Sequence, residues 1–506
     1  MQANNRIIIN TIAQYARTIV NTLLSLYSSR LVLDILGVDD FGIYALVGSV
    51  VSLLSFLTNS LVASTQRFLS VNQGNGDVEK LKIVFSNSLI IHLLLGLIVV
   101  IILGILSPYI FNGFLNIDEN RVDVAKILYK QVIWMVYISF ITSPFRALLV
   151  SHENIVYTSF IDVLDGVLKV ILVLFLHLFH DKLLAYGWIM FSIRTFNLLA
   201  FLIYCYIKYE ECILPRFSRF SGRYLKDLFA YTGWMLYSTG IITLRIQGIA
   251  VVLNKLLGTA VNAAYGIGSQ ISGMISFVSS SLNHSIAPQL MSSSGRGNND
   301  RMWFLAEIEC KFSFLLLGMI GIPTMFEMPT ILSMWLVEVP KHAALFGCMF
   351  ITMQMADMLS TGLSTINKAS GKVGLYVFVT YTPKLFIVPI CWFGLSHGMP
   401  LVYVYVFSVV VETISMLLRI FMTKSNSYFT PTKFIFSVII RSLPPVLVSV
   451  LICYLFINYI NNFNLRFVFT FIVSIVSYLS TAYLITLSKR EKQLVGAMLS
   501  KILRIK

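Results

Sequence analysis

About fourteen apolar stretches, each long enough to cross a bilayer, fill the chain from Ile7 to Leu487 and leave short polar connectors between them. A hydrocarbon core of about 30 Å requires about 20 mostly apolar residues per helix. Since backbone polar groups in lipid must be paired within each span, helices are the expected structure. The sequence therefore predicts an all-α integral membrane protein. The expected spans are residues 7–33, 42–65, 83–111, 126–150, 156–179, 184–207, 228–254, 261–287, 309–333, 343–366, 374–395, 401–423, 437–458 and 466–487.

Charge indicates how these spans are oriented. Hydrophobic residues make up 57% and charged residues 12% of the 506 positions, whereas a soluble domain contains about 25% charged residues. The net charge of +15 alone would suit a nucleic acid or a lipid surface. Lys and Arg are concentrated at both termini and in alternate connectors, about 24 there against about seven in the others. The positive-inside rule then predicts that both termini are cytoplasmic, and no nucleic-acid partner is expected.

Neither the six cysteines nor the last residues of the chain indicate a reactive site. The cysteines are scattered through or beside apolar stretches without paired spacing, so neither disulfides nor a metal site is expected. The last residues, 488–506, are basic and amphipathic, which predicts a tail lying on the inner membrane surface.

The first pair of predicted helices recurs halfway along the chain. Placing Gly37 over Gly258 starts both copies at equivalent topological points. It also aligns Leu36 with Leu257, Tyr44 with Tyr265, Ser55 with Ser276, Phe56 with Phe277, Ser60 with Ser281 and Leu61 with Leu282. Parallel repeats of this kind predict two pseudo-symmetric lobes around a central cavity. The expected divisions are an N-terminal lobe (1–207), a cytoplasmic connector (208–227), a C-terminal lobe (228–423), two additional helices (424–487) and the tail (488–506).

Both copies of this repeat resemble a known family. The stretch RLVLDILGVDDFGIYALVGSVVSLLSFL from Arg30, with Gln66-Arg67-Phe68 after it, resembles polysaccharide flippases of the multidrug/oligosaccharidyl-lipid/polysaccharide (MOP) exporter superfamily. LNKLLGTAVNAAYGIGSQISGMISF from Leu253, with Ala287-Pro288-Gln289 after it, is similar to flippases of the O-antigen type. The resemblance implies a MATE-like fold and export of lipid-linked oligosaccharides across the bacterial cytoplasmic membrane. It also implies coupling to H⁺ or Na⁺ with no other cofactor. Membrane lipids and polysaccharide-assembly proteins are the expected partners.

Four cations lie deep within predicted spans and are candidates for substrate binding: Arg17, Arg245, Arg194 and Lys384. An ionisable side chain at such depth costs at least about 2.5 kcal/mol on insertion, so it usually faces a cavity or a partner. Snorkelling or a structural ion pair is the simpler interpretation of each. The functional interpretation is a cationic cavity that binds the diphosphate of a lipid-linked sugar, since guanidinium groups bind phosphate oxygens bidentately.

Acidic residues within the spans are the candidates for ion coupling. Asp357 and Glu412 read as isolated buried acids. Either could bind a coupling H⁺ or Na⁺, and either could equally balance a neighbouring cation. Asp162, Asp165 and Lys169 share one face of the fifth predicted helix and are secondary candidates, with Asp165 and Lys169 most simply an ion pair.

Other classes of function fit the sequence less well. A primary pump needs the phosphate-binding pattern GxxxxGK[ST], and Gly371-Lys372 is followed by valine. A membrane glycosyltransferase or polysaccharide polymerase could use Asp39-Asp40, but the outer connectors are short and the pair reads as a turn or helix cap. We therefore expect no catalytic residues and no enzyme. A cation-coupled multidrug exporter of the same superfamily, or a lipid II flippase, remains the alternative.

Overall fold

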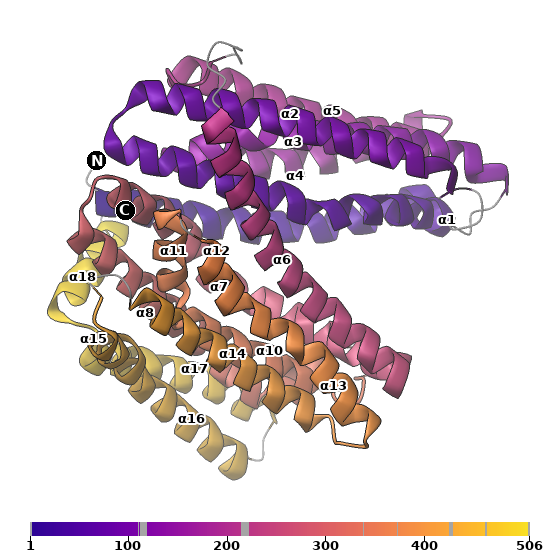
Figure 1. The fold of residues 1–506 in the computed structure, drawn as a ribbon. Helices are drawn as coiled ribbons and strands as arrows, with labels where there is room; N and C mark the ends of the chain where they lie inside the picture. Colours follow the sequence, from indigo (N-terminus) through magenta and orange to yellow (C-terminus); the bar gives the residue numbers. More distant parts are fainter. Residues whose placement is uncertain are drawn as a thin grey trace. The chain divides into compact units, whose positions relative to one another are not determined.

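A computed structural model describes residues 3–109, 111, 119–213, 222–336, 339–371, 373–424, 429–460 and 463–503. These residues form helices joined by short turns and include no strand (Figure 1). The α-helices are α1 (Ala3–Asn75), α2 (Val78–Tyr109), α3 (Val122–Ser151), α4 (Ile155–Leu174), α5 (Lys182–Lys208), α6 (Gly222–Leu257), α7 (Thr259–Gly295), α8 (Asn299–Phe326), α9 (Met328–Trp335), α10 (Ala343–Met358), α11 (Thr361–Ser370), α12 (Gly374–Tyr381), α13 (Ile387–Ser396), α14 (Val402–Thr423), α15 (Pro431–Phe434), α16 (Arg441–Tyr459), α17 (Phe463–Thr481) and α18 (Lys489–Leu503). Short 3-10 helices cover Glu119–Arg121 (η2), Phe175–Leu178 (η3) and Thr382–Phe386 (η5), and π-helices cover Ile435–Ile440 (η6) and Ala482–Thr486 (η7).

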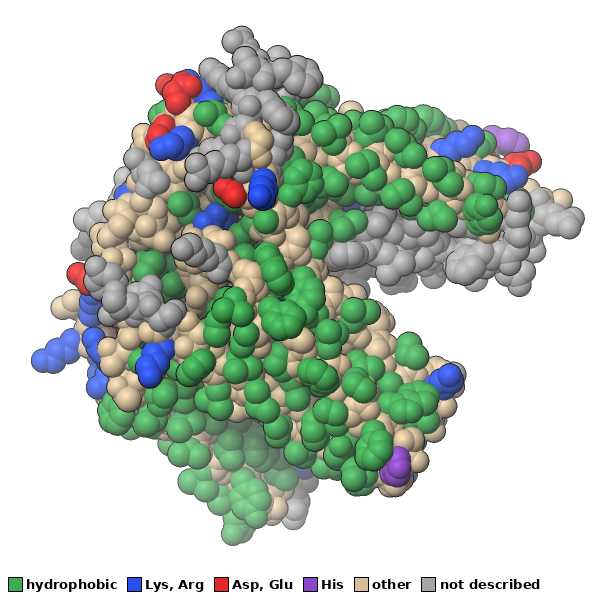
Figure 2. Space-filling model, in the orientation of Figure 1, with side chains coloured by type: hydrophobic (Ala, Val, Ile, Leu, Met, Phe, Trp, Pro, Cys, Tyr) green, Lys and Arg blue, Asp and Glu red, His purple; other side chains and the backbone are tan. Residues whose placement is uncertain are grey.

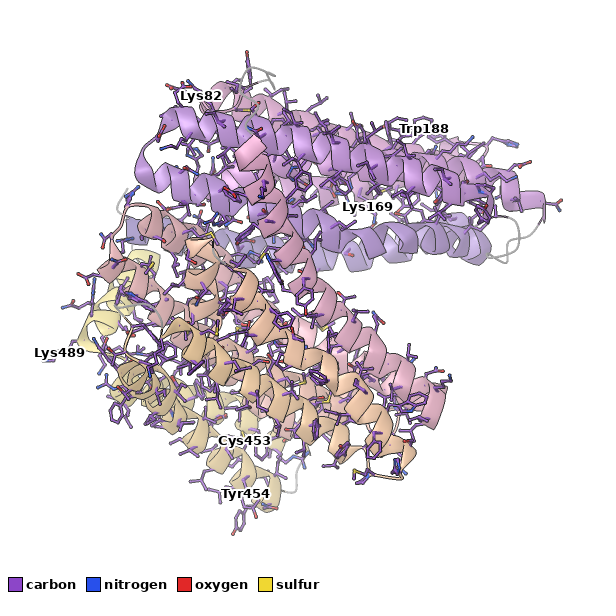
Figure 3. All side chains as sticks on the ribbon, in the orientation of Figure 1. Lys82, Lys169, Trp188, Cys453, Tyr454 and Lys489 are labelled. Carbon is purple, nitrogen blue, oxygen red and sulfur yellow. The ribbon has the colours of Figure 1, made fainter. Side chains whose placement is uncertain are left out.

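The described helices are those of a multi-pass membrane protein, which confirms the predicted fold class. Eight of them are long and apolar enough to cross a membrane, or ten if each of two bent pairs forms one span. The count of fourteen spans remains a prediction. Hydrophobic side chains cover much of the visible face of each unit, while Lys and Arg lie mainly toward the ends of helices (Figure 2). On α16, for example, Cys453 is buried, whereas the adjacent Tyr454 is exposed and points away from its unit (Figure 3).

The chain divides into two compact units. The N-terminal unit comprises Ile9–Leu236, and the C-terminal unit comprises Tyr237–Lys506 together with Met1–Ile8. In the N-terminal unit α3 packs against both α2 and α5, and α4 packs against α5. In the C-terminal unit α7 packs against α8 and α10, and α10 packs against α14. The division falls inside α6, so Arg245 belongs to the C-terminal unit.

The two glycines that the repeat aligns have the same backbone conformation. Gly37 breaks α1 with φ 79° and ψ 171°, and Gly258 separates α6 from α7 with φ 87° and ψ 177°. This region of φ/ψ space is essentially restricted to glycine, because a Cβ atom would clash there. The same break between the first two helices of each copy supports the internal repeat.

Two predicted spans are not the continuous helices that their hydropathy indicated. α8 and α9 meet at a bend of 78°, and α10 and α11 at a bend of 51°. The predicted span 374–395 is found as one continuous span, Gly374–Ser396, which passes through η5 with Pro383 near its start. Proline lacks the N–H that an α-helix needs at that position, so the backbone tightens into a 3-10 turn. α8 also begins ten residues earlier than the predicted boundary of 309, at Asn299.

Candidate functional site

In the N-terminal unit, Arg17 on α1 and Arg146 on α3 share one carboxylate on α4. Arg17 Nη1 donates to Asp162 Oδ2 over 2.6 Å. Arg146 donates to both oxygens of the same carboxylate, over 3.0 Å from Nη1 and 2.5 Å from Nη2. Charge-assisted bonds of this geometry are the strong class of hydrogen bond. Two cations against one acid leave this cluster with one excess positive charge.

Arg17 also lines a pocket on its own helix. The pocket has a volume of about 390 Å³. The residues that line it come from successive turns of α1, and each carries a polar group: Arg17, Thr18, Asn21, Thr22 and Ser25. The Oδ1 atom of Asn21 is buried and has no hydrogen-bond partner among the described residues. A cation beside hydroxyl and amide groups suits a polar, anionic group of a ligand.

The remaining predicted residues of the N-terminal unit lie on α4 and α5. Asp165 accepts a hydrogen bond from Asn197 on α5. Lys169 lies about one turn further along α4 and interacts electrostatically with Asp165 and with Arg194, without a direct ion pair to Asp165 among the described residues. Arg194 has an exposed side chain. Asp165 and Lys169 therefore interact with other residues than the cluster of Arg17, Arg146 and Asp162 does.

In the C-terminal unit, Glu412 on α14 is held by two cations from different helices. Arg245 Nη1 on α6 donates to Glu412 Oε2 over 2.7 Å, and Lys384 on η5 donates to Glu412 Oε1. The Glu412 and Lys384 side chains are each 3% exposed, and that of Arg245 is 12% exposed. The structure therefore corrects the interpretation of Glu412 as an isolated acid.

Asp357, the last but one residue of α10, is not isolated either. Arg419 Nη2 on α14 lies 2.8 Å from Asp357 Oδ1, and Lys384 Nζ lies 3.6 Å from the same oxygen. Arg419 Nη1 also donates to Ser360 Oγ, in the bend between α10 and α11, over 3.2 Å. The full cluster contains three cations, Arg245, Lys384 and Arg419, against two acids, so it too has one excess positive charge.

The two units share one arrangement. In each, a carboxylate within the membrane part binds two cations at once, and one of these is an arginine on α1 or α6. Sequence reasoning selected Arg17, Arg245 and Lys384 but missed Arg146 and Arg419. Both missed residues lie toward the ends of apolar stretches, where a cation normally snorkels. A count of charge within each span, including its last turn, would have found them.

Comparison with known proteins gives the family of the chain. Residues 5–293 match the model of a family described as polysaccharide biosynthesis protein. This match covers more than half of the 506 residues, so the chain belongs to that family, as the repeat motifs indicated. The chain is also similar to the uncharacterized membrane protein EpsK of Bacillus subtilis (strain 168), with 23% identity over 320 residues. That alignment covers 62% of this chain and 61% of EpsK, so the chain spans about three fifths of the relative's length.

Solved structures with a similar fold belong to the MOP superfamily. A crystal structure of a MATE mutant has a TM-score of 0.73 at 14% identity, and the match covers 84% of this chain and 96% of the other. A Vibrio cholerae MATE transporter matches with a TM-score of 0.71 at 14% identity, over 84% of this chain and 99% of that one. A MOP transporter from Pyrococcus furiosus, described as having a binding pocket of reverse polarity, matches with a TM-score of 0.69 at 14% identity, over 85% and 96%. These matches confirm the MATE-like fold.

Proposed function

We propose that the chain is a flippase, not an enzyme, that moves polyprenyl-diphosphate-linked oligosaccharides from the inner to the outer leaflet of the bacterial cytoplasmic membrane. It does so by ion-coupled alternating access and supplies units for surface polysaccharides of the O-antigen or capsule type. The observation that carries the proposal is the excess of positive charge in each unit, centred on Arg17 and Arg245. Membership of the polysaccharide biosynthesis protein family supports this class of substrate.

The diphosphate would bind where guanidinium groups have donors left. Arg17 donates one hydrogen bond to Asp162, and Arg245 donates one to Glu412. A guanidinium carries five N–H donors in a planar fork that matches two phosphate oxygens. In both clusters the acid stays paired through its second cation, Arg146 or Lys384, when the arginine turns to a ligand. A phosphate group can therefore be bound without leaving a carboxylate alone in the membrane.

A multidrug exporter of the same superfamily is the second candidate, and the MATE fold alone is compatible with it. The excess positive charge disfavours it, because a cationic drug would be repelled at these clusters. A lipid II flippase would use the same diphosphate chemistry and differs in the group that the diphosphate carries. Asp357 and Glu412 remain candidates for the coupling ion, H⁺ or Na⁺. Membrane lipids and polysaccharide-assembly proteins are the proposed partners.

Deletion of the gene in its natural host tests this function. We expect loss of one surface polysaccharide and accumulation of its polyprenyl-diphosphate-linked unit inside the cell, both reversed by a plasmid copy. Glycan blotting and mass spectrometry of extracted lipids measure these outcomes. Sensitivity to cationic drugs should stay unchanged. Intact surface glycans together with raised drug sensitivity would instead favour the multidrug exporter.

The proposed orientation has both termini in the cytoplasm. Arg296, in the turn between α7 and α8, and Ser396, at the end of α13, are both exposed and lie on opposite sides in this orientation. A cysteine replacing Ser396 should react with a membrane-impermeant maleimide in intact cells, and a cysteine replacing Arg296 only after the cells are opened. The background should be low, because five native cysteines are buried and Cys348 is half-buried. The reverse pattern of labelling would invert the orientation.

A further inference from the structure

Glu309 on α8 is a buried acid that takes no part in either charge cluster. Glu309 as a whole is 1% exposed. Thr365 Oγ1 on α11 lies 2.9 Å from Glu309 Oε1. The other carboxyl oxygen, Oε2, is fully buried and has no hydrogen-bond partner among the described residues.

This acid lies at a close contact between α8 and α11. The backbone N–H of Gly362 donates to Cys310 Sγ over 3.2 Å. A Cβ atom at Gly362 would lie 2.2 Å from the carbonyl oxygen of Ala306, so only glycine allows this approach. α11 is the half-helix that follows the 51° bend after α10. The contact between Glu309 and Thr365 therefore attaches α11, which is bent away from α10, to α8.

The hydrogen bonds around Thr365 fit a neutral Glu309 better than an ionised one. The Thr365 hydroxyl has a single hydrogen, yet it lies within bonding distance of both Glu309 Oε1 (2.9 Å) and Thr361 O (3.3 Å). A protonated Glu309 donates its own O–H to Thr365, which leaves the Thr365 hydrogen for Thr361 O. An ionised Glu309 takes that hydrogen and still leaves Oε2 as a buried charged oxygen without a partner.

The charges that face Glu309 do not neutralise it by contact. Lys368 on α11 acts on the carboxyl electrostatically, and no ion pair involving Glu309 exists among the residues described. Cys310 is its neighbour on α8, and Arg419 on α14 acts on that thiol while forming its own ion pair with Asp357. An ionised carboxylate at this position is therefore costly as long as α11 stays packed on α8.

We propose that Glu309 and Thr365 form a proton-binding site, in which the bound proton holds α11 against α8 and its release frees α11. The proton leaves the carboxyl group for water, and the resulting charge becomes stable when the contact opens. This deepens the proposed flippase function, on which it rests for its role: it names H⁺ as the coupling ion and adds Glu309 to the candidates Asp357 and Glu412 as a residue that binds it. The contact itself can be measured without any substrate.

Hydrogen–deuterium exchange of the full-length protein in nanodiscs tests the site. Exchange of the α11 amides, corrected for intrinsic chemical rates, should rise by at least about tenfold as the pH increases between about pH 5 and pH 9. Glu309→Gln, which mimics the neutral acid, should abolish this rise and keep α11 protected throughout. Glu309→Asp should keep a pH-dependent rise. Glu307→Gln is the matched control, because Glu307 lies two residues away on the same helix and is only partly exposed. This variant should behave like the wild type.

Two outcomes would overturn the proton site. One is a pH-independent exchange of α11 in the wild type, and the other is a wild-type pH response in Glu309→Gln. If Glu309→Gln fails to fold, the wild type and Glu309→Asp still decide the question. Protection of α11 that depends on Na⁺ at constant pH would refute the assignment to H⁺. Since no substrate is present, a failure here leaves the flippase proposal standing, and intact glycans after gene deletion would leave the proton site standing.

Discussion

Replacement of Glu412 by Ala is expected to destabilise the protein by about 3–5 kcal/mol, because it leaves buried cations without their acceptor. Glu412 binds both Arg245 and Lys384, and its own side chain is 3% exposed. The ammonium of Lys384 would keep its longer contact of 3.6 Å to Asp357 and its place 5.4 Å from the centre of the Tyr381 ring. The loss of stability is measured by heating the purified protein in detergent and recording the fraction that stays monodisperse at each temperature.

Two variants serve as controls for this prediction. Asp123→Asn removes an ion pair with Lys126 in which the Asp123 side chain is 93% exposed, so its effect should stay within about 0.5 kcal/mol. The double variant Glu412→Ala, Lys384→Met removes one of the cations as well and should recover part of the lost stability. Equal, small shifts for Glu412→Ala and Asp123→Asn would show that the cluster does not stabilise the fold.

The largest effect on transport is expected from Arg17→Ala combined with Arg245→Ala. Each variant removes charge-assisted hydrogen bonds to the diphosphate worth about 1.5 kcal/mol or more, so the double variant should transport about 100-fold more slowly. Stability should change little, because Asp162 keeps Arg146 and Glu412 keeps Lys384. Lys at both positions should retain part of the activity, since the charge remains without the bidentate geometry, and Gln should behave like Ala.

The sequence predicted the membrane fold and the two aligned glycines of the repeat, because each of these is visible in local patterns. The aligned glycines are an example, since only glycine adopts the conformation found at Gly37 and Gly258. The ion pairs could not be predicted from the sequence, because they join residues that are distant in the chain. Arg17 and Asp162 are 145 positions apart, and Arg245 and Glu412 are 167 apart. The hydrophobic periodicity of a helix does not indicate contacts between residues so far apart.

Glu309 shows a second reason for what the sequence did not reveal. The predicted span began at residue 309, so this acid stood at the boundary of the span and was not among the candidate residues. The structure starts α8 at Asn299 and buries Glu309 against α11. Hydropathy places the edge of the membrane only approximately, since a polar first turn and a buried polar turn look alike in sequence.

Transfer of a lipid-linked oligosaccharide in vesicles tests the central claim most directly. Purified protein would be reconstituted with the polyprenyl-diphosphate-linked unit that accumulates after gene deletion, and access of an external glycosidase to the sugar would be followed over time. We expect the wild type to expose the inner-leaflet sugar when an ion gradient is imposed, and the Arg17→Ala, Arg245→Ala variant to do so about 100-fold more slowly. Equal rates for the wild type, the double variant and protein-free vesicles would contradict it.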